Sequence, residues 1–188
     1  GESRRTGSTP GGAESAASTA AGGATAAGGT SAATSIPLPG RTLGRGVTIA
    51  RRFTHPHVHP FDAVAWELRT AALASEKGEV IFEQQGVEVP AFWSQMATNV
   101  VASKYFNGPV GTPERERSVK QLVTRVVGSI ARWGREQGVF DTPADADAFE
   151  AELTHMVLHQ MASFNSPVWF NVGIEEKPQC SACFINSV

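Results

Sequence analysis

Two cysteines stand near the C-terminus of this 188-residue chain, in the stretch Gln179-Cys180-Ser181-Ala182-Cys183-Phe184. A Cys-x-x-Cys spacing could form half of a zinc site, but such a site needs two further ligands and the chain has no second cysteine pair. It could also form a thioredoxin-like dithiol, which sits at a helix N-terminus, whereas the residues after Cys183 are typical of a strand. Three residues apart on a strand, two thiols face opposite sides, so we do not expect them to act as a pair. The spacing alone favours buried, inert cysteines.

The five histidines fall into two groups, and neither predicts a metal site. His55, His57 and His59 alternate and could share one face of a strand, but the prolines within and after this stretch favour a solvated loop. His155 and His159 are four residues apart and share a helix face. No glutamate stands between them in the zincin arrangement, which favours a structural role.

Two further features could contact a phosphate group. The triplet Asn165-Ser166-Pro167 offers a hydroxyl and free backbone N–H groups, although turn formation explains the same triplet equally well. A helix expected after Thr112 carries a basic face that acidic residues interrupt, which favours a solvated surface or a contact with the rest of the protein. The members of this basic face are Arg115, Arg117, Lys120, Arg125, Arg132 and Arg135.

The composition suits a soluble globular protein, with 41% apolar and 18% charged residues. A net charge of -2 gives no reason to expect nucleic acid or an acidic membrane surface as partner. No apolar run approaches the ~20 residues that span a bilayer, and two cysteines favour a reducing, cytoplasmic compartment. Residues 1–45 are mostly Gly, Ala, Ser and Thr, so we expect them to be disordered. A transit peptide is a less favoured alternative, because that class is Arg-rich and amphipathic.

Helical periodicity dominates residues 46–164, which we expect to form a mainly α domain of antiparallel helices. Thr112 and Thr142 each precede a proline and predict helix N-caps. Phe92, Met96 and Val100 fall near one helix face. The expected helices run from Asp62 to about Ser75, from Phe92 to Phe106, from Thr112 to Gly138 and from Thr142 to Phe164.

Shorter elements interrupt and follow these helices. Val80–Glu83 and Val87–Pro90 are expected to be extended. After Phe164 the helical period is lost, so Asn165–Gly173 is expected to be a structured loop or short strand. Ser181–Val188 is rich in strand formers and is expected to be a buried strand.

Several of these stretches together resemble one known family. Phe164–Gly173 and Pro178–Ile185 resemble the N-terminal region of class II, adenosylcobalamin-dependent ribonucleotide reductases. The resemblance runs in order from about residue 50 to residue 188 and leaves residues 1–45 outside. Upstream stretches that agree are Arg52-Phe53-Thr54, Val58-His59-Pro60-Phe61-Asp62, Phe82-Glu83-Gln84, Lys104-Tyr105-Phe106 and Gly111-Thr112-Pro113-Glu114-Arg115-Glu116.

The resemblance implies the reduction of ribonucleotides to 2′-deoxyribonucleotides by radical chemistry. Cobalamin homolysis generates a thiyl radical on one cysteine, which abstracts the 3′-hydrogen, and two other cysteines supply the electrons and become a disulfide. It implies that Cys183 is the first of this reducing pair, with a downstream partner that is not in this chain, and that Cys180 is a bystander. It also implies that Ser166 contacts the substrate diphosphate and that Ala182 and Cys183 line the ribose pocket.

For the whole protein the resemblance implies a ten-stranded α/β barrel. Residues 46–164 would then be its helical N-terminal domain and residues 165–188 the start of the catalytic barrel, an incomplete piece that is inactive alone. The implied enzyme is a vitamin B12-dependent ribonucleoside-diphosphate reductase that binds adenosylcobalamin, a ribonucleotide, nucleotide effectors and a thioredoxin-type reductant, with a homodimer as its assembly. Two other hypotheses stay open: a standalone helical binding module that uses the basic face, and a zinc protein through Cys180 and Cys183.

Overall fold

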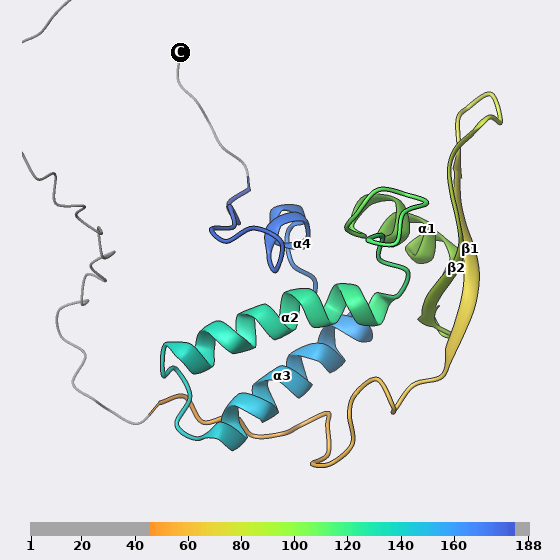
Figure 1. Ribbon diagram of the computed structural model, residues 1–188. Helices are drawn as coiled ribbons and strands as arrows, with labels where there is room; N and C mark the ends of the chain where they lie inside the picture. Colours follow the sequence, from red (N-terminus) through yellow and green to blue (C-terminus); the bar gives the residue numbers. More distant parts are fainter. Residues whose placement is uncertain (1–45, 183–188) are drawn as a thin grey trace, which may run out of the picture. The chain divides into compact units, whose positions relative to one another are not determined.

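Two strands and four helices make up residues 46–182, the part of the chain that this computed structural model describes. All of these residues fall in one compact unit. The elements are β1 (Trp66–Ala74), β2 (Val80–Pro90), α1 (Gln95–Lys104), α2 (Val119–Glu136), α3 (Pro143–Leu158) and α4 (Ser166–Asn171). The expected disorder of residues 1–45 and the expected role of Cys183 lie outside the described residues. Figure 1 shows α2 and α3 side by side, with α1 against the strand pair.

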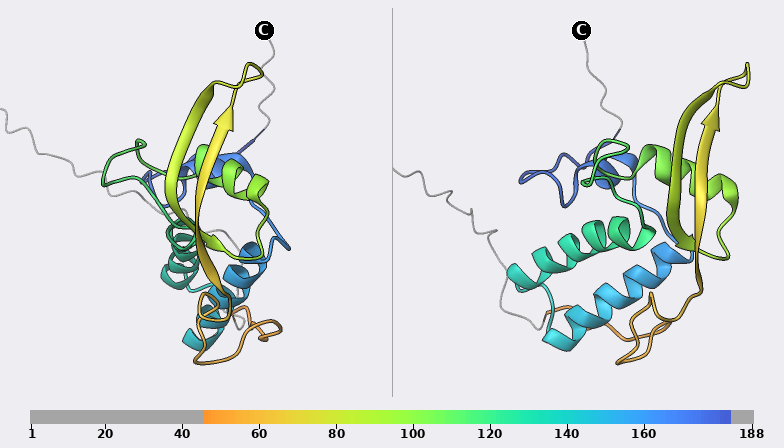
Figure 2. Two further views of the ribbon diagram at one scale, coloured as in Figure 1. Left: turned by 90° about the vertical axis from the view of Figure 1, so that its right-hand side faces the viewer. Right: turned by 45° about the vertical axis from the view of Figure 1, so that its right-hand side comes forward.

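The two strands form an antiparallel hairpin, whose register runs from Trp66 opposite Pro90 to Ala74 opposite Val80. Its tip extends beyond the helices, as Figure 2 shows. The extended structure expected within 80–90 is confirmed, but the helix expected from Asp62 to Ser75 is wrong. Asp62 belongs to a turn, in which its N–H donates to the carbonyl of His59 at 2.8 Å. The hydrogen bonds of β1 go to a partner strand, and a nonlocal ladder of this kind outweighs local propensity.

The helices expected at 92–106 and 142–164 are confirmed in type, and their observed bounds are shorter. The helix α1 begins after Ser94, whose hydroxyl accepts the N–H of Ala97 at 3.0 Å. The helix α3 begins as expected after Thr142, which forms a capping box with Asp145. It ends at Leu158 rather than near Phe164, and beyond its end Gln160 has a φ of 57°. A residue in that left-handed region cannot continue a right-handed helix.

The helix α2 begins at Val119 and not at Thr112, where the sequence predicts an N-cap. Ser118 is the observed cap and forms a capping box with Gln121. The preceding residues are turned so that Arg115 and Glu116, each 8% exposed, point inward. A carboxylate oxygen of Glu116 accepts the N–H of Asn107 at 2.7 Å. These buried polar contacts displace the start of the helix by six residues from the predicted cap at Thr112 to the observed cap at Ser118.

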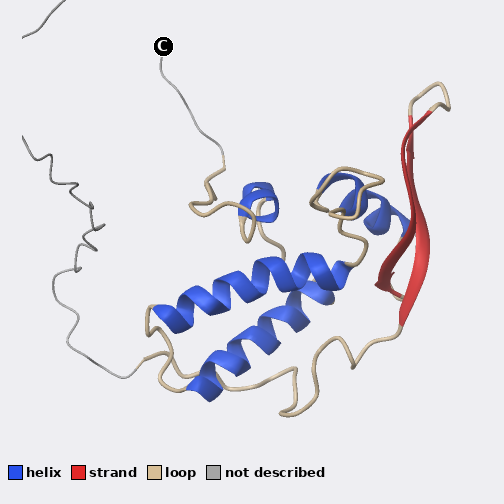
Figure 3. Ribbon diagram, viewed as in Figure 1, coloured by secondary structure: helices blue, strands red, loops and turns tan. Residues whose placement is uncertain are grey.

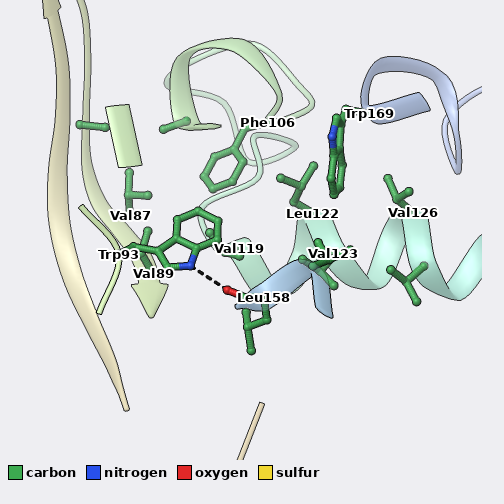
Figure 4. Close-up of a cluster of buried hydrophobic side chains, with 14 of the residues drawn as sticks. Val87, Val89, Trp93, Phe106, Val119, Leu122, Val123, Val126, Leu158 and Trp169 are labelled. Carbon is green, nitrogen blue, oxygen red and sulfur yellow. Dashed lines mark hydrogen bonds between the residues drawn. The ribbon is translucent and has the colours of Figure 1, made fainter. Parts of the chain in front are cut away.

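The hydrophobic core lies where the hairpin, α1 and α2 meet the end of α3. Trp93 fills the centre of this junction, and its indole N–H donates to the carbonyl of Leu158 at 2.8 Å (Figure 4). This arrangement is stable because the apolar ring is removed from water and its indole N–H keeps a hydrogen-bond partner. Figure 3 shows that the hairpin is the whole of the described strand content. Side chains at most 1% exposed at this junction include Val87, Val89, Val119, Val123 and Val126.

Candidate functional site

The segment that contains the predicted substrate residues begins with a short helix. The sequence predicts a loop or strand at Asn165–Gly173, and that prediction is wrong, because Ser166–Asn171 forms α4. Asn165 caps α4: its side-chain oxygen accepts the N–H of Val168 at 3.2 Å. Proline in the first turn is compatible with helix, since its missing N–H is unpaired there in any case.

Two asparagines hydrogen-bond the ends of α4 to the backbone of Gln179 and Cys180. The side-chain N–H of Asn165 donates to the carbonyl of Cys180 at 3.1 Å. The side-chain N–H of Asn171 donates to the carbonyl of Gln179 at 2.7 Å. On the inner side of α4, Trp169 is 6% exposed and donates its indole N–H to the carbonyl of Phe164 at 3.0 Å. The segment 165–182 is therefore tied together at both ends of α4.

Ser166 is half-buried in the first turn of α4. Its hydroxyl lies 3.2 Å from the hydroxyl of Tyr105, a hydrogen bond in which either group can donate. The ring of Tyr105 stacks on Phe170 with 5.4 Å between centroids. The ring of Tyr105 also lies 6.3 Å from that of Trp169, so Tyr105 contacts three residues of α4. Its contact with Ser166 orients the hydroxyl that is predicted to meet the substrate.

Arg125 of α2 connects this helix to α4, a role that the sequence pattern did not predict. Its guanidinium donates to the carbonyls of Trp169 at 3.0 Å and Val172 at 2.9 Å. It also pairs with Glu116 at 2.7 Å, and the two side chains are only 11% and 10% exposed. The carbonyls at the end of α4, which lack partners within the helix, are thus satisfied by a buried cation.

A signal for this role exists in the sequence. Arg125 follows Leu122 by three residues and precedes Ser129 by four, and both of these neighbours are buried. Residues at such spacings share one helix face, so Arg125 belongs to the inward stripe of α2 rather than to a solvated one.

Four of the five remaining members of the predicted basic face also have partners within the described residues. Lys120 pairs with Glu88 at 2.7 Å, and Arg135 pairs with Asp147 and Glu150 at 2.9 and 2.8 Å. Arg115 is buried and donates to the carbonyl of Phe106 at 2.7 Å. Arg132 lies 3.8 Å from Glu136 in an exposed pair. Five of the six predicted cations therefore have partners within the described residues, which counts against a binding module that relies on this face.

The structure describes one of the two cysteines. Cys180 is half-buried and free, and its Sγ lies 3.7 Å from the carbonyl of Pro178. The next residues, Ser181 and Ala182, are exposed and do not lie in a strand, so the predicted buried strand does not include them. Cys183 lies outside the described residues, and its separation from Cys180 across a strand stays a prediction.

The histidines take the structural positions that the sequence favours. His55, His57 and His59 are exposed in a loop. His155 stacks on His159 at 4.1 Å and on Phe53 at 5.2 Å between ring centroids. Burial lowers the pKa of His155 below its ordinary value, and the neighbouring His159 lowers it further. Among residues 46–182, no group of three or more His, Cys, Asp or Glu side chains could hold a metal ion.

Comparison with known proteins identifies the family. The sequence model of the family described as class II vitamin B12-dependent ribonucleotide reductase matches residues 67–160, which is half of the chain. The chain is 53% identical over 150 residues to a vitamin B12-dependent ribonucleotide reductase of Streptomyces coelicolor, covering 79% of this chain and 16% of that protein. It is 49% identical over 158 residues to one of Rhodopirellula baltica (69% of this chain, 15% of that protein). It is 33% identical over 159 residues to one of Bradyrhizobium diazoefficiens (67% and 13%).

All three relatives are oxidoreductases that carry the name ribonucleotide reductase. The chain belongs to the class II vitamin B12-dependent ribonucleotide reductase family and corresponds to its N-terminal region, as the resemblance predicts. It spans about one sixth of the length of the curated relatives that it matches. Among residues 46–182, none of the helices has the length and apolar character needed to cross a bilayer.

Proposed function

We propose that this chain is the N-terminal part of an enzyme that reduces ribonucleotides to 2′-deoxyribonucleotides, and that it is inactive without the rest of the polypeptide. The observation that carries the proposal is the family match over residues 67–160. That range includes Tyr105, Glu116 and Arg125, the residues whose contacts hold α4. The match therefore covers the scaffold of the segment that contains Ser166.

In this proposal Cys183 is one of two cysteines that supply electrons to the ribose. The C2′–OH bond breaks and the oxygen leaves as water, while a hydrogen takes its place at C2′. The two thiols lose two electrons and two protons and form a disulfide, which makes the step favourable. The second cysteine and the thiyl-radical cysteine belong to the rest of the full-length polypeptide. Cys180 has no role in this exchange.

Ser166 and Ala182 are proposed to contact the substrate. The hydroxyl of Ser166 is held by Tyr105 at 3.2 Å, and a held hydroxyl loses little side-chain entropy when it donates to a phosphate oxygen. Ala182 is exposed and small, so it offers room for a ribose beside Cys183. A nucleoside diphosphate is the proposed substrate.

Adenosylcobalamin is the proposed cofactor of the full-length enzyme, where it supplies the radical that starts the reaction. The residues described here do not fit it. The apolar groove between α1 and α4 has a volume of about 450 Å³, which is small beside a corrin ring that carries an adenosyl group. We therefore assign cofactor binding to the rest of the polypeptide.

The rest of the proposal concerns the assembled enzyme. Its catalytic domain is a ten-stranded α/β barrel that begins within residues 165–188. It works in the cytoplasm as a homodimer, responds to nucleotide effectors and is re-reduced by a thioredoxin-type protein. The two-cysteine content of this chain is consistent with a reducing compartment.

The proposal is tested by expressing this chain together with its natural continuation and assaying cobalamin-dependent reduction of a ribonucleoside diphosphate. Cys183→Ser should abolish turnover coupled to a dithiol reductant, and Cys180→Ser should retain it as the matched control. The reverse pattern would overturn the assignment of the two cysteines. Absence of cobalamin-dependent reduction by the full-length protein would overturn the proposed function.

A further inference from the structure

The helix α1 has an apolar stripe that faces solvent. The stripe consists of Met96 and Val100, which are four residues apart and 70% and 39% exposed. The opposite face of α1 packs toward the hairpin through Thr98 and Ala102, both fully buried. A surface helix normally presents polar side chains to water.

The sequence predicts Phe92, Met96 and Val100 near one helix face. Met96 and Val100 lie in α1 and share a face that does not pack on the hairpin, whereas Phe92 lies before the helix. Phe92 precedes the N-cap Ser94, and its ring stacks on His159 with 5.0 Å between centroids.

This stripe forms one wall of an apolar groove with a volume of about 450 Å³. Met96 and Val100 of α1 line the groove, together with Leu122 of α2 and Trp169 of α4. Ala162 and Ser163, which lead directly into α4, also contribute. The groove therefore adjoins the segment that contains Ser166.

The size of this surface favours a tethered occupant over a second copy of the chain. A stable association between separate chains buries about 800 Å² on each partner and some twenty to thirty residues a side. Here the exposed apolar stripe has two side chains, Met96 and Val100, beside a small groove. An intramolecular contact needs far less area, because the covalent connection supplies a high effective concentration. The aligned 150 residues are 16% of the Streptomyces coelicolor relative, which is therefore about five times as long as this chain, so a full-length protein of that size offers a tethered partner of ample size.

We propose that the groove between α1 and α4 receives apolar side chains from the remaining part of the same full-length polypeptide. This inference rests on the proposed function only in taking the chain as the N-terminal part of a longer reductase. Because Trp169 and Ser163 line the groove, the occupant packs against the base of α4. Docking would then fix α4, and with it Ser166, relative to the catalytic part of the enzyme.

Methionine oxidation tests this proposal, since susceptibility to peroxide depends on exposure. Met96 should be oxidised about tenfold more slowly in the full-length protein than in the 188-residue chain, as expected when an exposed side chain becomes accessible only through local opening. Met156, which is half-buried within α3, is the internal control and should change little. Mass spectrometry of the Met96 peptide gives both rates.

Two variants of the full-length protein separate docking from other causes. Val100→Glu charges the groove wall at an exposed position and should return Met96 oxidation to the rate in the 188-residue chain. Leu68→Glu, at a 72% exposed site on β1, should leave the protection of Met96 intact. Equal Met96 rates in the two proteins would overturn the proposal, and so would protection in the 188-residue chain that grows with its concentration. Protection without ribonucleotide reduction would refute the proposed function and leave the docking in place.

Discussion

Removing the guanidinium of Arg125 should loosen α4 and destabilise the whole fold. Arg125→Met keeps the length and apolar character of the side chain and removes its charge and its donors. The substitution leaves the carboxylate of Glu116 buried without its cation, and it frees the carbonyls of Trp169 and Val172. Breaking a buried ion pair by removing one partner costs about 3–5 kcal/mol, because the remaining charge stays desolvated.

The assay combines global and local measurements. Urea denaturation gives the free energy of unfolding, and hydrogen exchange of the α4 amides reports local opening. The matched control is Arg132→Met on the same helix, whose pair with Glu136 has 60% and 62% exposed side chains at 3.8 Å. An exposed pair of this kind contributes about 0–1 kcal/mol, so Arg132→Met should change the free energy of unfolding very little.

A double variant decides whether the pair itself is responsible. Replacing Glu116 by Gln in the Arg125→Met background removes the stranded charge, so the combined loss should be smaller than the sum of the two single losses by about 1–3 kcal/mol. The reasoning is refuted if Arg125→Met costs no more than Arg132→Met. It is also refuted if the amides of α4 exchange at unchanged rates while the protein as a whole is destabilised.

Three further predictions concern single contacts. Burial raises the pKa of Glu152, but hydrogen bonds from the Thr54 side chain and from backbone N–H groups outweigh it and hold the pKa below the ordinary 4.5. The ionised carboxylate therefore stabilises the fold fully above pH 4.5, and this contribution is lost as the pH falls through the folded-state pKa. In Glu152→Gln the free energy of unfolding should fall less steeply with decreasing pH below 4.5, as urea denaturation at several pH values would measure. Tyr105→Phe and Ser166→Ala should be coupled by about 0.5–1.5 kcal/mol in denaturation, and additive losses would contradict their hydrogen bond. Gly173 has a φ of 78°, and a Cβ added there would lie 2.6 Å from Cγ of Arg125, whereas Gly138 has a φ of 62° and open space around it. Gly173→Ala should therefore lower the free energy of unfolding more than Gly138→Ala in urea denaturation. Equal losses would contradict the clash with Arg125.

Local chemistry explains which elements the sequence could predict. The start of α3 is encoded within four residues, because Thr142 and Asp145 cap each other reciprocally. An apolar stripe repeats along α2 at spacings of three and four residues, and its first five members are buried: Val119, Leu122, Val123, Val126 and Val127. Both features depend on contacts close in sequence, which a pattern can reveal without knowledge of the fold.

Nonlocal contacts explain the errors. The residues of β1 predict a helix, because the pairing of β1 with β2 is a tertiary contact that the composition of β1 does not determine. The cap predicted at Thr112 was wrong because Arg115 and Glu116 must turn inward, where Arg115 donates to Gln84 at 2.9 Å. The pattern of the basic face favours either a solvated surface or a contact with the rest of the protein, and it does not single out Arg125 as a buried residue.

The conformation of α4, which contains Ser166, depends on contacts with α2 and with the end of α1 that lie far from it in the sequence. An isolated helix of six residues is not stable in water, so α4 must owe its conformation to tertiary contacts. Those contacts come from Arg125 on α2 and from Tyr105 at the end of α1, and Glu116 in the intervening segment fixes Arg125. Ser166 is therefore positioned by residues that lie 41 to 61 positions earlier in the chain, between Tyr105 and Arg125. A substitution at Glu116 should alter the geometry of Ser166 without touching it, which makes this buried carboxylate part of the architecture of the site.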